Sequence, residues 1–397
     1  MKVQTILNDL LIEITPNMHK VRRKSLEASI TSLISGADLS VTSLGRNIDS
    51  QTTEKHQIKR SDRLCKNIHL HQELSGVYSG LCRQLIGNQK QPIILVDWSD
   101  LDTRKDLFLI RASVAIEGRS LTLLDEVQPL SLKEKPAVHR KFMEQLKSIL
   151  PTDCKPIIVT DAGFRVPWFK LIESLGWDYI GRVRNKTFCL NTTDEDWHPV
   201  KDLYPQASST EKDLGTYQLA KANPINCQMA VYKSKKKGRK DLVAKGDRSR
   251  KSKKSLSNAA REREPWLLAT SLPSGKTNFA RRIVKIYRSR MQIEESFRDL
   301  KTGLNFNESN TRKKKRIEVL LLISIIAQYI LFLLGMTVKL LNKHRQYQAN
   351  SIKDRNVLSY QFIGQRAFKD KHLKLNENDF IAGFERIQIL ITDISIV

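Results

Sequence analysis

Four side chains within residues 287–301 could hold a metal ion and a phosphate at one place. The segment contains no Gly or Pro and its apolar residues recur at helical spacing, so we expect one continuous helix. Tyr287, Arg290, Glu294 and Lys301 follow one another at intervals of 3, 4 and 7 residues. At roughly 100° per residue they share a stripe about 60° wide beside the apolar face. An ordinary solvated helix face with i,i+4 ion pairs has the same spacing.

Two aspartates elsewhere in the chain could complete a set of metal ligands. Each ends a similar phrase, Pro-Ile-Ile-Leu-Val-Asp at 92–97 and Pro-Ile-Ile-Val-Thr-Asp at 156–161. A short apolar run bounded by turn signals is typical of a buried strand, and the final acid would lie where the strand leaves the sheet. One such Asp is more often a cap or turn residue. Asp97, Asp161 and Glu294 together form a set of hard oxygen ligands that suits Mg²⁺.

Neighbouring acids compete for the same roles. Asp100 and Asp102 follow Asp97 closely, and we expect them to be loop caps. Glu295 is turned about 100° away from Glu294 on a helix and so leaves the stripe. We therefore choose Asp97, which ends its apolar strand, and Glu294, which shares the stripe.

The charge of the chain points to a polyanionic partner. Its 397 residues contain 68 Lys plus Arg against 42 Asp plus Glu, a formal charge of +26. Such a chain repels itself unless a polyanion offsets the charge, so nucleic acid is the expected partner. Basic proteins that package nucleic acid share this balance but rarely have a globular composition of this length with buried acids. Two to four domains are expected from the length.

One apolar stretch, residues 319–336, is about as long as a membrane span and follows the basic residues 312–316. Ser324, Gln328 and Gly335 interrupt it, and the sequence has no second span. We expect a fully buried core helix and no membrane. The scattered cysteines form no Cys-x-x-Cys pair, and the start of the chain lacks a signal peptide, so we expect a cytoplasmic protein with reduced cysteines.

Residues 1–88 are expected to form a helical DNA-binding domain. Short helices are predicted at 21–34, 41–48 and 53–66. Short helices joined by tight turns, the last one basic, fit a helix-turn-helix that enters a major groove. Its candidate DNA contacts are Lys59, Arg60 and Arg63, which could equally make non-specific phosphate contacts.

An α/β core should position the acids. Strands are expected at 92–97, 107–115, 119–125, 156–161 and 178–183, with helices at 138–150 and 167–175. Three meandering strands, a crossover helix and two parallel strands are the order of a ribonuclease H-like mixed sheet. In that fold, acids on the first and fourth strands and on a later helix converge on two metal ions. We assign 89–184 and 273–342 to the two parts of this core.

Two segments lie outside that core. Residues 185–272 are expected to form a mainly β insertion that does not continue the sheet, with a loop of many Lys and Arg between 233 and 254 that would contact phosphates. Residues 343–397 end in an apolar stretch that could pack on the core or on a second subunit.

The three acids and the pattern Tyr-x2-Arg-x3-Glu-x6-Lys resemble bacterial insertion-sequence transposases of the DDE type, in the insertion sequence four family. Four phrases are similar to the branch that contains the transposon Tn-ten enzyme. They are Val-Asp-Trp-Ser-Asp (96–100), Thr-Asp-Ala-Gly-Phe (160–164), Glu-Pro-Trp-Leu-Leu-Ala-Thr (264–270) and Arg-Met-Gln-Ile-Glu-Glu (290–295). The resemblance spans nearly the whole chain, from residue 44 to residue 358.

The resemblance implies cut-and-paste transposition: 3′-end hydrolysis, hairpin formation, hairpin opening and strand transfer into target DNA. It implies Asp97, Asp161 and Glu294 as ligands of two Mg²⁺ ions, for which Mn²⁺ would substitute. Arg290 and Lys301 would neutralise a phosphate at or beside the cut, and Tyr287 would contact the flanking nucleotide.

Trp266 has two interpretations. It is either a core residue on a strand or, as the resemblance implies, a platform that stacks on a base flipped out of the bent hairpin.

Two other functions stay open. One is a decayed, inactive transposase that still binds transposon ends, and the other is a related nuclease or junction resolvase that cuts without joining. The resemblance also implies a homodimer, because two transposon ends must be cut in concert, acting on double-stranded DNA in a bacterial nucleoid.

Overall fold

The computed structural model describes most of the chain. The described residues are 3–101, 104–184, 187–192, 195–234, 252, 253, 256, 264–275, 277–349, 351 and 357–396. Most of the predicted basic loop, and Asp102, lie outside them. The chain divides into two compact units: unit 1 comprises Met1–Pro156 and Met291–Ile396, and unit 2 comprises Ile157–Arg290.

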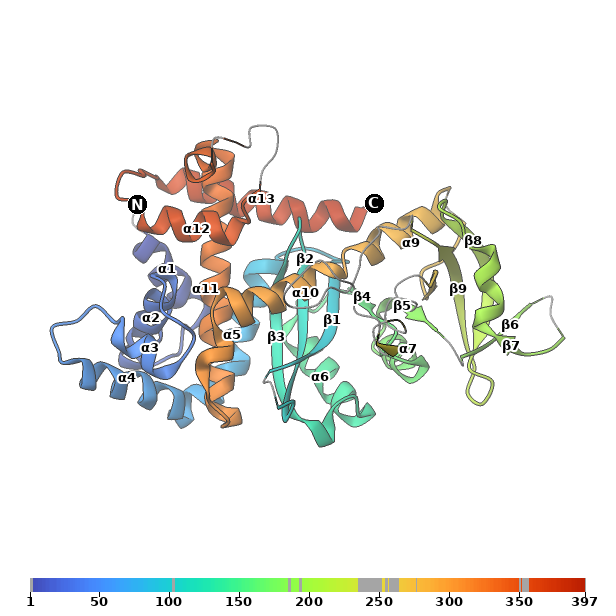
Figure 1. The fold of residues 1–397 in the computed structure, drawn as a ribbon, viewed down its shortest axis with the longest axis horizontal. Helices are drawn as coiled ribbons and strands as arrows, with labels where there is room; N and C mark the ends of the chain where they lie inside the picture. The colour runs from blue at the N-terminus through green and yellow to red at the C-terminus, as the bar shows by residue number, and fades with distance from the viewer. Residues whose placement is uncertain are drawn as a thin grey trace. The chain divides into compact units, whose positions relative to one another are not determined.

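Unit 1 is a three-stranded sheet packed among helices (Figure 1). Its N-terminal helices are α1 (Val3–Ile14), α2 (Lys20–Ile34), α3 (Val41–Arg46), α4 (Glu54–Lys66) and α5 (Ile68–Ile86). The strands β1 (Ile93–Asp100), β2 (Leu107–Ala115) and β3 (Ser120–Pro129) are followed by α6 (Pro136–Ile149). The later elements are α10 (Met291–Arg298), a π-helical turn (Asp299–Gly303), α11 (Lys314–Leu340), α12 (Tyr360–Lys369) and α13 (Glu377–Ile396).

The sheet of unit 1 is an antiparallel meander in the order β3-β2-β1. Gly118, with a φ of 71°, lies in the hairpin turn between β2 and β3, and Ile116 N donates to Arg119 O across the turn. β1 is longer than predicted, because its pairing with β2 continues to Asp100 opposite Phe108. Asp97 therefore lies inside the strand rather than at its end, which corrects the prediction.

The long apolar helix α11 is the central helix of unit 1. Figure 1 shows it between the N-terminal helices and the sheet, and it contacts α2, α4, α12, α13 and β3. It is the one helix in the described part of the chain that is long and apolar enough to cross a membrane, and its whole apolar window is buried in the protein. A helix that is apolar all round needs such burial, and the predicted core helix is confirmed.

The predicted N-terminal helices form at their expected places. α3 and α4 cross in close contact, because a Cβ on Gly45 would come 2.5 Å from the Cα of Ile58. The side chain of Ser40 caps α3 by accepting from Ser43 N, as expected for Ser at an N-cap. The helices predicted from sequence are thus confirmed, while their use in DNA binding stays a prediction.

Unit 2 contains the second part of the α/β pattern. Its strands are β4 (Ile157–Thr160), β5 (Asp178–Val183), β6 (Phe188–Asn191), β7 (His198–Pro199), β8 (Lys212–Leu219), β9 (Ile225–Tyr232) and β10 (Trp266–Thr270). Its α-helices with described bounds are α7 (Val166–Ser174) and α9 (Phe279–Arg288). β4 and β5 are parallel and the other pairs are antiparallel.

The β-rich segment of unit 2 extends the sheet, contrary to the prediction that it stands apart. The strand order is β4-β5-β10-β9-β8-β6-β7, so β10 pairs directly with β5 and β9 follows it. Apolar side chains on both faces of β10 explain this, since Leu267, Leu268 and Ala269 are all fully buried. A strand buried on both faces belongs inside a sheet.

The helix predicted through residues 287–301 is broken. α9 ends at Arg288 and α10 begins at Met291, with Ser289 and Arg290 in a turn between them. The backbone N–H groups of these two residues bond three residues back, to Ile286 O and Tyr287 O, and Ser289 Oγ also donates to Ile286 O at 2.6 Å. A hydroxyl that bonds to nearby backbone competes with the helical pattern. The proposed single stripe therefore does not exist as one helical face.

Candidate active site

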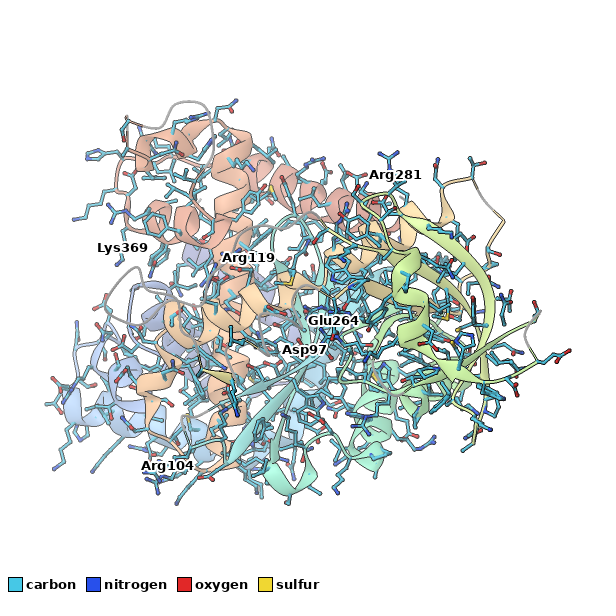
Figure 2. All side chains as sticks on the ribbon, turned by 45° about the vertical axis from the view of Figure 1, so that its right-hand side comes forward. Asp97, Arg104, Arg119, Glu264, Arg281 and Lys369 are labelled. Carbon is cyan, nitrogen blue, oxygen red and sulfur yellow. The ribbon has the colours of Figure 1, made fainter. Side chains whose placement is uncertain are left out.

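Asp97 begins a row of charged residues across the sheet of unit 1. On β1 it pairs with Arg111 of β2, and Arg111 pairs with Asp125 of β3. Directly opposed residues in neighbouring strands point to the same face. Asp97, labelled in Figure 2, therefore shares a face with a buried ion pair, in which Arg111 Nε and Nη2 donate to Asp125 at 2.8 and 2.7 Å.

The same face carries α10, the helix of Glu294. Arg111 Nη1 donates to Ser296 Oγ at 3.2 Å, and the Arg111 guanidinium lies 5.1 Å from the centre of the Phe297 ring. α10 packs on β1, β2 and β3. Unit 1 therefore brings the strand of Asp97 and the helix of Glu294 together.

On the other face of β1, Trp98 joins the strand to α6. Its Nε1 donates to His139 Nε2 of α6 at 3.1 Å. Burial lowers the pKa of His139 to about 4, so its imidazole is neutral and can accept this bond at neutral pH. The backbone N–H of Trp98 in turn donates to Asp97 Oδ1 at 2.8 Å.

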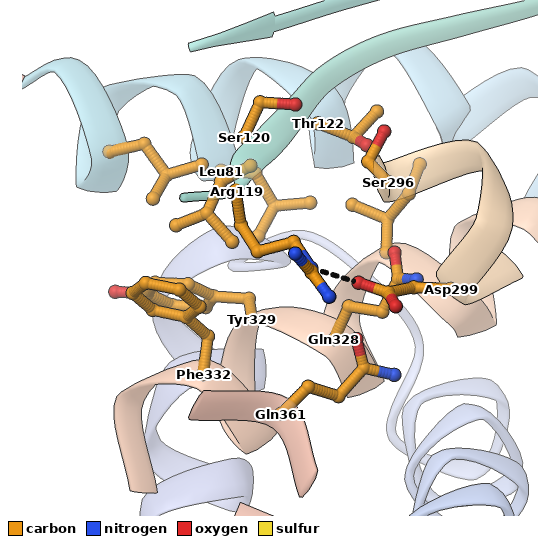
Figure 3. Close-up of a pocket in the computed structure, with 13 residues that line it drawn as sticks. Leu81, Arg119, Ser120, Thr122, Ser296, Asp299, Gln328, Tyr329, Phe332 and Gln361 are labelled. Carbon is orange, nitrogen blue, oxygen red and sulfur yellow. Dashed lines mark hydrogen bonds and ion pairs between the residues drawn. The ribbon is translucent and has the colours of Figure 1, made fainter. Parts of the chain in front are cut away.

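Glu295 and Asp299 fasten α10 to the β2–β3 hairpin. Arg119 donates to Asp299 Oδ2 at 2.7 Å (Figure 3). Arg119 also lies 3.4 Å from Glu295 Oε2, and Glu295 pairs with Arg298 as well. Burial raises the pKa of Asp299, and the Arg119 charge opposes that shift. The Arg119–Asp299 pair lines a cavity whose lining residues are drawn in Figure 3. Its volume is about 20 Å³, room for about one water molecule.

Lys301 is paired with an acid that the sequence predicted as a loop cap. Its Nζ donates to Asp100 Oδ1, and Asp100 is the last residue of β1. Partial burial raises the pKa of Asp100, but the hydrogen bond and charge of Lys301 outweigh it and the pKa is lowered. Lys301 lies in the π-helical turn after α10, so it too departs from the predicted regular helix.

Unit 2 gathers Asp161, Tyr287 and Arg290. Asp161 follows β4 directly, as predicted, and its Oδ1 accepts from Gly163 N at 2.7 Å. Tyr287 is buried near the end of α9, and burial raises its pKa. Arg290 and Arg182 oppose the rise, whereas Asp161 adds to it. The Arg290 guanidinium also lies 5.9 Å from the centre of the Tyr287 ring.

Arg182 was not among the predicted site residues and lies on β5 beside this group. Its Nη2 donates to the carbonyl oxygens of Glu264 at 3.3 Å and Pro265 at 3.1 Å. A basic residue near the end of the predicted strand 178–183, after Tyr179 and Ile180, is the signal that could have found it.

Trp266 has features of both interpretations made from sequence, the core residue and the exposed stacking platform. It is the first residue of β10 and is half-buried, whereas the next four residues are buried. Its ring meets Tyr287 edge-on with the ring centres 5.0 Å apart, and meets Tyr232 at 5.7 Å. Trp266 therefore packs on the aromatic cluster of unit 2 while part of its surface stays accessible.

On α4 the three predicted DNA contacts differ. Lys59 and Arg63 are exposed and lie four residues apart on one helix face. Arg60 is half-buried and bonds to α2, donating to Lys24 O at 2.9 Å and to Ser25 Oγ at 3.2 Å. In this structure the Arg60 guanidinium joins two helices.

The candidate residues are thus divided between the units. Asp97, Glu294 and Lys301 belong to unit 1, and Asp161, Trp266, Tyr287 and Arg290 belong to unit 2. Among the described residues no group of three or more His, Cys, Asp or Glu is gathered closely enough to hold a metal ion. The structure assembles two groups of site residues, each within its own unit.

The fold is a mixed α/β one, consistent with a ribonuclease H-like domain that carries an acid on β1, after β4 and on α10. The model of the family described as "Transposase DDE domain" matches residues 88–330, more than half of the chain, and the chain belongs to this family. A comparison with curated proteins finds no match. Family membership supports a transposase function and implies DNA binding. Enzymes of this family generally use divalent metal ions.

Proposed function

We propose that this protein is a cut-and-paste DNA transposase of the insertion sequence four family, in the branch of the transposon Tn-ten enzyme. It would hydrolyse the 3′ ends of its element, form and open hairpins, and join the ends to target DNA. The match to the transposase domain over residues 88–330 carries this proposal. Asp97, Asp161 and Glu294 are the proposed catalytic residues.

The donor chemistry of unit 1 fits a divalent cation. Asp97 shares the face of the sheet that α10 covers, and Glu294 lies on α10. Its neighbour Glu295 pairs with Arg119 and Arg298. Carboxylate oxygens are the ligands that Mg²⁺ prefers. When bound, two such ions activate the attacking oxygen and stabilise the leaving oxygen in phosphoryl transfer.

The basic and aromatic residues would bind the DNA strand. In unit 2, the Arg290 and Tyr287 side chains are already in contact, so a phosphate on Arg290 would lie beside the phenol. In unit 1, Lys301 would have to share its ammonium between Asp100 and a phosphate. An ammonium has three donors and can serve both.

Trp266→Ala is expected to slow hairpin formation while sparing the first nick. A half-exposed indole can stack on a displaced base, and base–aromatic stacking contributes about 1–3 kcal/mol, so we expect a loss of about 5- to 150-fold in the hairpin step. Time courses of nicked and hairpin products on an end fragment measure it. Trp266→Phe, which keeps an aromatic ring, is the control. Equal loss of both steps would show that Trp266 serves the fold alone.

Lys59→Ala and Arg63→Ala are each expected to weaken binding to DNA of any sequence and to reduce the salt dependence of binding. Each removed phosphate contact lowers the slope of log K against log salt by about 1. Arg60→Ala is the comparison, since its guanidinium bonds to α2 and its loss should lower the melting temperature instead. Filter-binding titrations at several salt concentrations measure the slope for each variant. An unchanged slope in both exposed variants would remove α4 from the DNA interface.

The proposed function is tested by excision. A plasmid that carries the coding segment with its native flanks is incubated with the purified protein and Mg²⁺, and the flank and element ends are sequenced. Double-strand breaks with hairpin element ends are expected. End binding without cleavage would favour the alternative, a decayed transposase that only binds its ends.

A further inference from the structure

The buried pair of Arg111 and Asp125 has no part in the function proposed so far. Both side chains are completely buried in unit 1, and the guanidinium meets the carboxylate through two parallel hydrogen bonds. Such a pair stabilises a fold weakly, because removing two charges from water costs about as much as their attraction returns. Its presence in the middle of an apolar sheet therefore calls for another role.

The pair reaches both elements that carry the acids of unit 1. Arg111 is the direct cross-strand partner of Asp97. Its third nitrogen, Nη1, donates to Ser296 Oγ, and Ser296 is two residues after Glu294 on α10. Ser296 Oγ in turn donates to Ile293 O at 2.8 Å, so the hydroxyl links the guanidinium to the backbone of α10.

The orientation of this guanidinium is fixed on every side. Arg111 Nε and Nη2 donate to the Asp125 carboxylate, and Nη1 donates to Ser296 Oγ. The Phe297 ring lies against the guanidinium. A rigid fork of donors held in this way is specific to Arg, since Lys offers one point charge. Gln292 and Asp299 hold the same helix to Ile116 and Arg119, at the end of the hairpin. Arg111 instead holds it next to the strand position of Asp97.

We propose that Arg111, oriented by Asp125, is a positioning residue that sets the place of Glu294 relative to Asp97 and thereby tunes the affinity for the metal ion. The inference rests on the proposed function, in which these two acids are ligands. Partners that orient metal ligands typically change metal affinity or activity by about 10- to 100-fold when they are removed.

The test uses Ser296→Ala, which breaks the link between Arg111 and α10 but leaves the ion pair in place. The matched control is Ser324→Ala on α11, whose buried hydroxyl also bonds to a carbonyl three residues back, Leu321 O at 2.7 Å, in the same helical geometry. Mn²⁺ binding to the full-length protein is measured by electron paramagnetic resonance, with Glu294→Gln defining the ion held at this site. Melting temperatures are measured alongside.

Ser296→Ala is expected to weaken Mn²⁺ binding about tenfold or more relative to Ser324→Ala, with similar melting temperatures for the two variants. Arg111→Lys, which keeps the charge, should show the same weakening. Equal Mn²⁺ affinity of Ser296→Ala and Ser324→Ala would overturn the inference, and so would the absence of a Glu294-dependent ion in the wild type. Failure of the proposed function appears differently, as a wild type that binds Mn²⁺ at Glu294 but neither cuts nor joins DNA.

Discussion

Glu294→Gln is expected to lower the rate of metal-dependent cleavage by a factor on the order of 10³ or more. Binding to the transposon ends should stay at the wild-type level. The amide keeps the shape of the side chain but loses the charge that holds a cation, and a bound metal supplies several kcal/mol of transition-state stabilisation. Cleavage of a labelled end fragment and gel-shift binding of the same fragment are the two measurements.

Glu295→Gln is the matched control for that variant. It removes ion pairs with Arg119 and Arg298 on the part-exposed side of α10, and pairs of this kind contribute about 0–1 kcal/mol. Cleavage should therefore remain within about fivefold of wild type. If Glu295→Gln abolished cleavage and Glu294→Gln did not, the assignment of the helix ligand would be wrong by one residue.

Gly335→Ala is expected to destabilise unit 1 by about 3 kcal/mol or more. A Cβ at this position would lie 1.9 Å from Tyr360 O, and one on Gly364 would lie 2.0 Å from Leu331 O. The helices α11 and α12 therefore cross backbone against backbone, and neither backbone can yield to a new methyl group without moving the helix. Urea unfolding monitored by circular dichroism measures the change.

Gly76→Ala is the control for the steric argument. Gly76 is exposed on α5, and nothing lies within 4 Å of an added Cβ, so the change should stabilise the protein by about 0.5–1 kcal/mol through helix propensity. Wild-type stability of Gly335→Ala would contradict the close crossing of α11 and α12.

Local patterns in the sequence predicted the elements well. The apolar phrases before Asp97 and Asp161 do form strands, and the long stretch around Gln328 forms a buried helix. These signals are local, because a run of β-branched residues or an all-round apolar helix must be buried wherever it lies. The ends of β1 were harder to predict, since the extra residues up to Asp100 are fixed by pairing with β2.

The arrangement of the site was less predictable than its residues. Helical spacing predicted Tyr287 and Glu294 on one helix face. In the structure, Ser289 Oγ donates to Ile286 O, which favours a turn between α9 and α10. Arg111 is the one charged residue of the predicted strand 107–115, but its partner Asp125 is identified by strand register rather than by sequence distance. Likewise, only the pairing of β10 with β5 shows that the β-rich segment extends the sheet of unit 2. Pairing between distant segments decides the last two of these features.

Covalent joining of the element to target DNA is the measurement that distinguishes a transposase from a nuclease. Purified protein, Mg²⁺, a fragment with precut native ends and a supercoiled target plasmid are combined, and joined products are sequenced across the junctions. We expect junctions between the 3′ ends of the element and the target, and we expect Glu294→Gln to form none. Cutting without any joined product would rule out a transposase and indicate a nuclease or resolvase with the same fold.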